Sequence, residues 1–259
     1  MRMPGMRVVL TTCALLLVCT VPLATAETIQ KGSVRVAFDG DISPQKLPRS
    51  GSAPVKVAVS AKISATKGKK LPAQLTAITI AINRYGRLDA TGLPVCRVED
   101  IQPATTQKAL EECRPSLVGQ GRFAATTSLS KQGTFPASGK LYAFNGTYEG
   151  RPAILAHVYG TDPVPTSFTL PFVISKSKGT FGTVLKARIP ASEDSYVTGI
   201  ELNLQRSFSY RGRKRSYASA SCPAPKGFRA ATFSFAKASF AFTGGKRLDS
   251  TLIRTCRAG

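Results

Sequence analysis

The stretch "YVTGIELNLQRSFSY", residues 196–210, alternates between two kinds of side chain along its length. One side would carry a mainly apolar set, with Arg206 as the exception: Tyr196, Thr198, Ile200, Leu202, Leu204, Phe208 and Tyr210. The other side would carry polar residues: Glu201, Asn203, Gln205 and Ser207. Successive side chains of a strand point to opposite faces, so this period of two indicates one buried and one solvated face. The segment therefore predicts one long antiparallel strand.

The same alternation recurs in four further segments: "VKVAVSAKI" (55–63), "ITIAIN" (78–83), "FTLPFVI" (168–174) and "LKARI" (185–189). In "ATFSFAKASFAF" (231–242) the phase breaks, and a bulge near Lys237 would explain the break. Turns are expected at four dipeptides that end in glycine: Asn145-Gly146, Glu149-Gly150, Arg211-Gly212 and Gly244-Gly245. Strands at this spacing predict an all-β, antiparallel, sandwich-like fold.

One segment is different. "PATTQKALEEC", residues 103–113, is rich in good helix formers, and Thr105 or Thr106 can cap its start. We expect one short helix near residues 104–113.

A weak internal echo suggests a repeat. "LTAITIAINR" (75–84) aligns without gaps on "VTGIELNLQR" (197–206), and a cysteine, Cys96 or Cys222, follows each segment. A duplicated half-unit, with lobes at about 27–148 and 149–259, would produce this pattern. Two unrelated strands with the same alternation would also produce it, so one exported domain over 27–259 is the expectation, and the pseudo-repeat is left open.

The first 26 residues have the layout of a secretory signal peptide. Arg2 and Arg7 precede an apolar run that ends at Val18, and Ala24-Thr25-Ala26 forms an A-x-A cleavage site. The apolar run is too short to span a membrane, which needs about 20 apolar residues. We therefore predict cleavage after Ala26, and a secreted or envelope-associated protein with no membrane span after cleavage.

Export sets the expectation for the cysteines. Cys13 and Cys19 leave with the signal peptide, and an even number remains: Cys96, Cys113, Cys222 and Cys256. In an oxidising compartment such a set predicts disulfides, and three connectivities are possible. The local pairing Cys96–Cys113 and Cys222–Cys256 is favoured because each bridge closes a short loop. The rival, a zinc site, lacks a C-x-x-C spacing, so no metal or other cofactor is expected.

The composition points to anionic partners. Without Arg2 and Arg7 the chain keeps 34 basic residues against 14 acidic ones, a net charge of +20. One stretch, "RSFSYRGRKRSY", interleaves aromatic residues with five cations: Arg206, Arg211, Arg213, Lys214 and Arg215. Such surfaces bind single-stranded nucleic acid and other polyanions. A solvated surface on a generally basic protein is the simpler interpretation of a charge run.

Candidate catalytic groups are few. His157 is the only histidine, and it lies in "AILAHVY" with apolar residues on both sides, as expected for a hydrogen-bonded core residue of a central strand. In the alternative, Asp162 orients His157 as a general base, but neither a G-x-S-x-G nor an H-E-x-x-H motif accompanies them. Two carboxylate pairs, Asp39 with Asp41 and Glu99 with Asp100, could serve a hydrolase, although a turn is the preferred interpretation of both.

Three segments carry a resemblance that covers most of the mature chain: residues 81–123, residues 151–175 and "CPAPKGF", residues 222–228. The chain resembles secreted proteins of soil actinobacteria. The resemblance implies an exported actinobacterial protein, and it assigns no activity and no catalytic residue to any position.

The sequence therefore favours a non-enzymatic, envelope-associated protein that binds an anionic cell-wall polymer or another polyanion through a basic surface. Two alternatives stay open. One is an extracellular hydrolase that uses His157 or a carboxylate pair, and the other is a structural or protein-binding module.

Overall fold

The computed structural model describes residues 26–66, 68, 70–129, 133–162, 164–190, 192 and 194–259. The predicted signal peptide, apart from Ala26, lies outside these residues. The strands of the first half are β1 (Glu27–Lys31), β2 (Val34–Ser43), β3 (Lys46–Leu47), β4 (Ala53–Pro54), β5 (Lys56–Ala65), β6 (Leu75–Asn83), β7 (Gly86–Leu88), β8 (Leu117–Leu129) and β9 (Gly133–Tyr148). Those of the second half are β10 (Arg151–Gly160), β11 (Thr166–Lys176), β12 (Phe181–Arg188), β13 (Ser195–Leu204), β14 (Ser207–Tyr210), β15 (Arg213–Ser216), β16 (Ala218–Ala220), β17 (Ala230–Phe242) and β18 (Arg247–Ala258).

The helical segments are short: α1 (Val98–Ile101), α2 (Thr106–Cys113), η1 (Arg114–Ser116) and η2 (Thr243–Gly245). The predicted helix is confirmed as α2, and Thr105 caps it by accepting a hydrogen bond from the backbone N–H of Lys108. Within the described ranges, no helix has the length and apolar character needed to cross a membrane.

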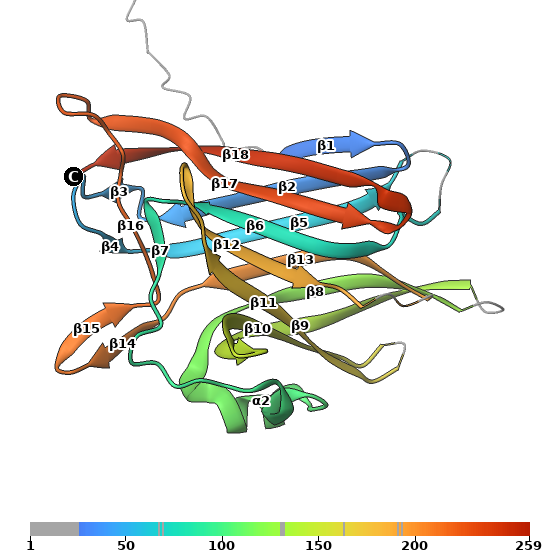
Figure 1. The fold of residues 1–259 in the computed structure, drawn as a ribbon. Coiled ribbons are helices and arrows are strands. Elements are labelled where there is room, and N and C mark those ends of the chain that lie inside the picture. The colour runs from blue at the N-terminus through green and yellow to red at the C-terminus, as the bar shows by residue number, and fades with distance from the viewer. Residues whose placement is uncertain are drawn as a thin grey trace, which may run out of the picture.

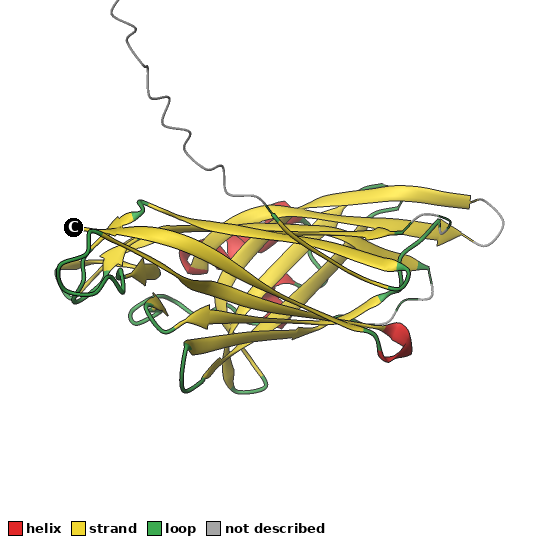
Figure 2. Cartoon of the chain, turned by 90° about the horizontal axis from the view of Figure 1, so that it is seen from above, coloured by secondary structure: helices red, strands yellow, loops and turns green. Residues whose placement is uncertain are grey.

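Most of the chain forms one curled sheet, so the predicted all-β antiparallel fold is confirmed. Its strand order is β1-β2-β5-β13-β8-β9-β10-β11-β12-β6-β17-β18-β3. The sheet bends until β18 lies against β1 and β2, and its two walls enclose the core (Figure 1). A small sheet, β4-β16-β7, and the β14–β15 hairpin stand at one end of this enclosure. Seen from above, strands make up most of the described chain (Figure 2).

The two halves of the chain contribute their strands in the same order. Residues 27–148 supply β1, β2, β5, β6, β8 and β9, and residues 149–259 supply β10, β11, β12, β13, β17 and β18. In the sheet, however, β6 and β13 exchange places: β13 lies between β5 and β8, and β6 lies between β12 and β17.

The register of the exchanged strands follows the sequence echo. Leu202 of β13 pairs with Val59 and Gly121, and the aligned Ile80 of β6 pairs with Leu185 and Ala238. A duplicated unit that exchanged one strand would give this arrangement. Strands from residues 27–148 and from 149–259 therefore belong to one sheet.

Side chains join the returning strand β18 to β2. The guanidinium of Arg254, only 8% exposed, donates to the carbonyl oxygen of Gly40 at 2.7 Å and to Asp39 Oδ1 at 2.5 Å. A Cβ on Gly40 would lie 3.2 Å from Leu252 Cδ1 and 3.0 Å from the Ala58 carbonyl oxygen, so only glycine fits comfortably here. These contacts hold β18 against β2, where the sheet returns on itself.

Two local predictions are refined. The stretch 196–210 is not one strand, because β13 ends at Leu204 and β14 begins at Ser207, on either side of the exceptional Arg206. A bulge between Val197 and Gly199 also shifts its register. The bulge expected near Lys237 lies at Phe235 instead, between Ser234 and Ala236 of β17.

The turns expected at residues 39–41 and at Asn145-Gly146 are wrong as well. Asp39 and Asp41 lie within β2, and Asn145-Gly146 lies within β9. Gly146 is needed there because the Cys96 carbonyl oxygen would lie 2.6 Å from a Cβ at that position. Glu99 and Asp100 lie in the one-turn helix α1 rather than in a turn.

Separating the halves is expected to abolish folding of each. A fragment of residues 27–148 would leave β5 and β8 without β13 between them, so it should show no cooperative urea unfolding. Mixing it with the fragment 149–259 should restore a single transition, because the missing strands are then supplied. A cooperative transition of either fragment alone would contradict the expectation that each half needs the strand supplied by the other.

Candidate functional site

A helical segment that carries a disulfide packs on β9 and β10. Cys96 and Cys113 are bonded, which confirms the predicted pairing, and α2 packs on β9 and β10 (Figure 1). Ile101, Ala109, Phe144 and Leu155 form a small core beneath it. Asp100 lies near the two sulfurs, but these are joined to one another and offer no thiolate to a metal.

His157 lies in β10 under this segment and is fully buried. Its inner-face neighbours on the strand, Ala156 and Val158, belong to the main core, so β10 is covered on both sides as predicted. The predicted core position is confirmed, but the expected hydrogen bond is wrong, because neither ring nitrogen has a hydrogen-bond partner among the described residues. Burial lowers the pKa of His157 below its ordinary value, and the nearby backbone of Ile101 offsets only part of this effect.

The residues considered for catalysis are not brought together. Asp162 is exposed and accepts a hydrogen bond from the Thr161 hydroxyl at 3.1 Å, and no described contact joins it to His157. Asp39 is held by Arg254, and Asp100 by Arg97 at 3.0 Å. Asp41 accepts from the backbone N–H of Ile42 at 2.8 Å. Asp39, Asp41, Asp100 and Asp162 thus each have a local partner, and Glu99 is exposed on α1.

The basic hairpin gathers part of the predicted cationic set. Tyr210 of β14 pairs with Arg213 of β15 across the turn at Arg211-Gly212. The guanidinium carbons of Arg211 and Arg215 lie 5.2 and 5.6 Å from the centre of the Tyr210 ring. An open hollow is lined by Thr91, Tyr210, Arg211, Arg213 and Arg215.

The loop after β7 fixes the hairpin in place. Asp89 Oδ2 accepts from Arg215 Nη1 at 2.8 Å, and the Asp89 N–H donates to the Tyr217 carbonyl oxygen at 2.8 Å. Partial burial would raise the pKa of Asp89, but hydrogen bonds from Thr91 and the charge of Arg215 hold it below its usual value. Gly92 has a φ of 90°, and a Cβ there would lie 2.2 Å from the Tyr210 ring. Gly92 is therefore required twice, for its backbone conformation and for contact with Tyr210.

Other members of the predicted set lie elsewhere. Lys214 pairs with Ser209 and points to the opposite face of the hairpin from Arg213 and Arg215. Arg206 is half-buried at the base, where Nη2 donates to the Pro115 carbonyl oxygen at 3.5 Å. Tyr217, which the sequence grouped with the binding aromatics, is buried, and burial raises the pKa of its hydroxyl.

The second disulfide anchors the segment that follows the hairpin. Cys222 and Cys256 are bonded as predicted, which ties the chain after β16 to β18. The Cys222 N–H also donates to the Pro48 carbonyl oxygen at 2.9 Å. The hairpin and the small sheet are thus held by the Asp89 contacts on one side and by the Cys222–Cys256 bond to β18 on the other.

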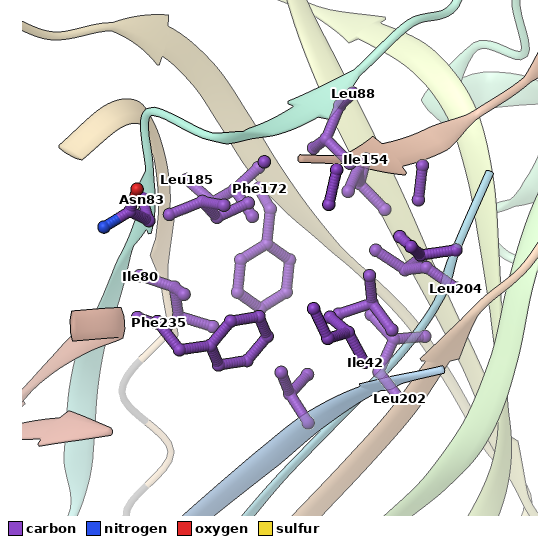
Figure 3. Close-up of a pocket in the computed structure, with 18 of the residues that line it drawn as sticks. Ile42, Ile80, Asn83, Leu88, Ile154, Phe172, Leu185, Leu202, Leu204 and Phe235 are labelled. Carbon is purple, nitrogen blue, oxygen red and sulfur yellow. The ribbon is translucent and has the colours of Figure 1, made fainter. Parts of the chain in front are cut away.

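A cavity of about 100 Å³ lies inside the curled sheet, next to the small sheet. Figure 3 shows apolar side chains from opposite walls turned toward one space, among them Ile42, Ile80, Phe172, Leu185, Leu202, Leu204 and Phe235. Leu88, Ala218 and Ala220 of the small sheet also line it. Sequence patterns could not reveal it, because they predict which side chains point inward but not whether these meet.

The cavity contains almost no polar surface. The Asn83 side chain borders it, but Nδ2 donates to the Ser234 carbonyl oxygen and Oδ1 accepts from the Tyr85 N–H. Water needs two to four polar partners, so this space stays dry when nothing else fills it. At about 24 cal/mol per Å³, an empty cavity of this volume costs about 2.4 kcal/mol of folding free energy.

Comparison of the chain with family models, curated proteins and solved structures finds no match.

Acidification is expected to destabilise the protein through His157. The pKa of this group is lowered by folding, so between that value and about 6.5 the unfolded chain binds a proton that the folded chain does not. The free energy of unfolding should therefore be constant above about pH 6.5 and fall below it, by at most about 1.4 kcal/mol per pH unit. Urea unfolding between about pH 7.5 and about pH 5 measures this window.

The matched variant is His157→Leu, which puts an apolar side chain in the same place and removes the only histidine. Its unfolding free energy should not decline over that window, since no unpaired ring has to charge. The same decline in both proteins would show that another group causes it.

Proposed function

We propose that the protein is an exported, non-enzymatic binding protein of the cell envelope whose β14–β15 hairpin binds an anionic cell-wall polymer. One observation carries the proposal: Arg211, Arg213 and Arg215 converge with Tyr210 on a single open hollow. Their guanidinium groups present several donors toward one space, the arrangement that suits phosphate or carboxylate groups.

The charge of this hairpin is largely free to act on a ligand. The described residues form five ion pairs, and one of them, Arg215 with Asp89, involves the hairpin. Arg211, Arg213 and Lys214 are exposed and have no carboxylate partner in the described part of the chain. A net charge of +20 on residues 27–259 adds a field that draws polyanions toward the protein.

The hairpin is also held rigidly enough to serve as a site. Asp89 and Gly92 fix Arg215 and Tyr210, as described above, so the groups around the hollow are positioned before a ligand arrives. Pre-positioned groups lose less conformational freedom on binding than free surface lysines do. In this respect the hairpin differs from cations spread over the outer strand faces.

Neutralising the hairpin should weaken polymer binding. The variant Arg211→Gln/Arg213→Gln/Lys214→Gln keeps Arg215, because that residue holds the hairpin to Asp89. Affinity for purified anionic wall polymer, measured against salt concentration, should fall, and the slope of log K against log salt should flatten by up to about 0.9 per lost phosphate contact. Thermal stability should change little, since the three side chains are exposed.

The control variant removes the same charge from the outer strand faces. Lys56, Lys62 and Lys186 are exposed on β5 and β12, and their replacement by Gln should leave most of the affinity intact. If the two variants lose the same affinity, the hairpin is not a site and only the diffuse positive field binds the polymer.

A further inference from the structure

The shape of the cavity suits an extended chain. Its lining on β6 runs from Ile78 to Ile82, and on β13 from Ile200 to Leu204. Four residues of strand span about 13 Å, so the apolar lining extends about 13 Å along the strands, and we call the space that it borders the slot. A lining that follows the strands in this way suits an extended hydrocarbon chain.

The floor of the slot is closed by aromatic packing. Phe38 and Phe240 meet edge to face with ring centres 5.9 Å apart, and both border the cavity. Further along the interior, Phe123 and Phe168 make a second edge-to-face pair at 5.0 Å. The curled sheet is therefore filled at one end and hollow at the other.

The hollow end is the end that carries the basic hairpin. Leu88 of β7 lines the slot, and the next residue, Asp89, holds Arg215 of the hairpin. Thr91, three residues after Leu88, lines the cationic hollow. An apolar slot and a group of arginines thus lie on two sides of one short segment, and this segment is the cover of the slot.

We propose that the slot binds the hydrocarbon chain of a single-chain anionic amphiphile, whose acidic headgroup lies at the hairpin. The lining surface is almost entirely apolar and the Asn83 side chain is already paired, so a hydrocarbon suits the slot better than water or a polar ligand. The cations beside the cover select a negative headgroup. The placement of the headgroup rests on the proposed function of the hairpin, whereas occupation of the slot by the chain does not.

Calorimetric titration with carboxylates of increasing chain length, each below its micelle-forming concentration, tests the slot. From hexanoate through octanoate to decanoate the affinity should rise about fourfold per added methylene, with a negative heat-capacity change. An affinity independent of chain length would overturn the proposal, because headgroup contact alone would then account for binding.

Adjacent residues of β5 provide matched variants. Val59 points into the slot and Ala58 is exposed on the outer face. Val59→Phe should reduce decanoate affinity at least tenfold, whereas Ala58→Phe should leave it unchanged. The milder Val57→Leu, also in the slot, should give an intermediate loss if the larger side chain prevents folding. Equal losses for Ala58→Phe and the slot variants would overturn the assignment.

Decan-1-ol separates the chain from the headgroup. In the hairpin variant Arg211→Gln/Arg213→Gln/Lys214→Gln, decanoate should bind only as well as decan-1-ol, and the affinity for decan-1-ol should equal that of the wild type. Unchanged decanoate binding would overturn the headgroup placement while leaving the slot assigned. Loss of polymer binding with these results intact would concern the hairpin alone, so failure of either proposal can be recognised.

Discussion

The exchange of β6 and β13 between the two halves is the constraint on which the rest of the fold depends. Each half leaves a gap between two of its strands, and the other half fills it. The continuous sheet then returns on itself, where Arg254 joins β18 to β2. A buried guanidinium needs its partners, so the contacts with Gly40 and Asp39 hold β18 against β2.

Curling creates an interior that side chains must fill. At one end pairs of phenylalanines do so, and at the other end apolar side chains from opposite walls leave a cavity between them. The small sheet covers this hollow end, and the loop after β7 attaches the basic hairpin to the cover. The two proposed binding sites, for a hydrocarbon chain and for negative charge, therefore lie at the same end of the curled sheet.

Local patterns predicted what depends on local chemistry. Alternation predicted β5, β6, β11, β12, β17 and part of β13, helix formers and a capping threonine predicted α2, and the expected export with an even number of cysteines predicted both disulfides. Pairing could not be predicted, because β6 and β13 carry the same alternation and neither segment specifies its neighbours. The glycines at 40 and 146 suggested turns, although the sheet needs them for close backbone approach. The roles of Asp89 and Gly92 depend on the docked hairpin, which the sequence of either segment alone does not specify.

The location of a bound chain tests the central claim most directly. Isotope-edited nuclear Overhauser effects can be measured between decanoate and the methyl groups of isoleucine, leucine and valine. The account predicts contacts from the terminal methyl group of the ligand to Ile78 and Ile200 at the floor, and from the protons beside the carboxylate to Leu88 and Leu204 near the cover. Contacts confined to exposed side chains such as Val95 and Ile253 would contradict it, because the chain would then lie outside the sheet.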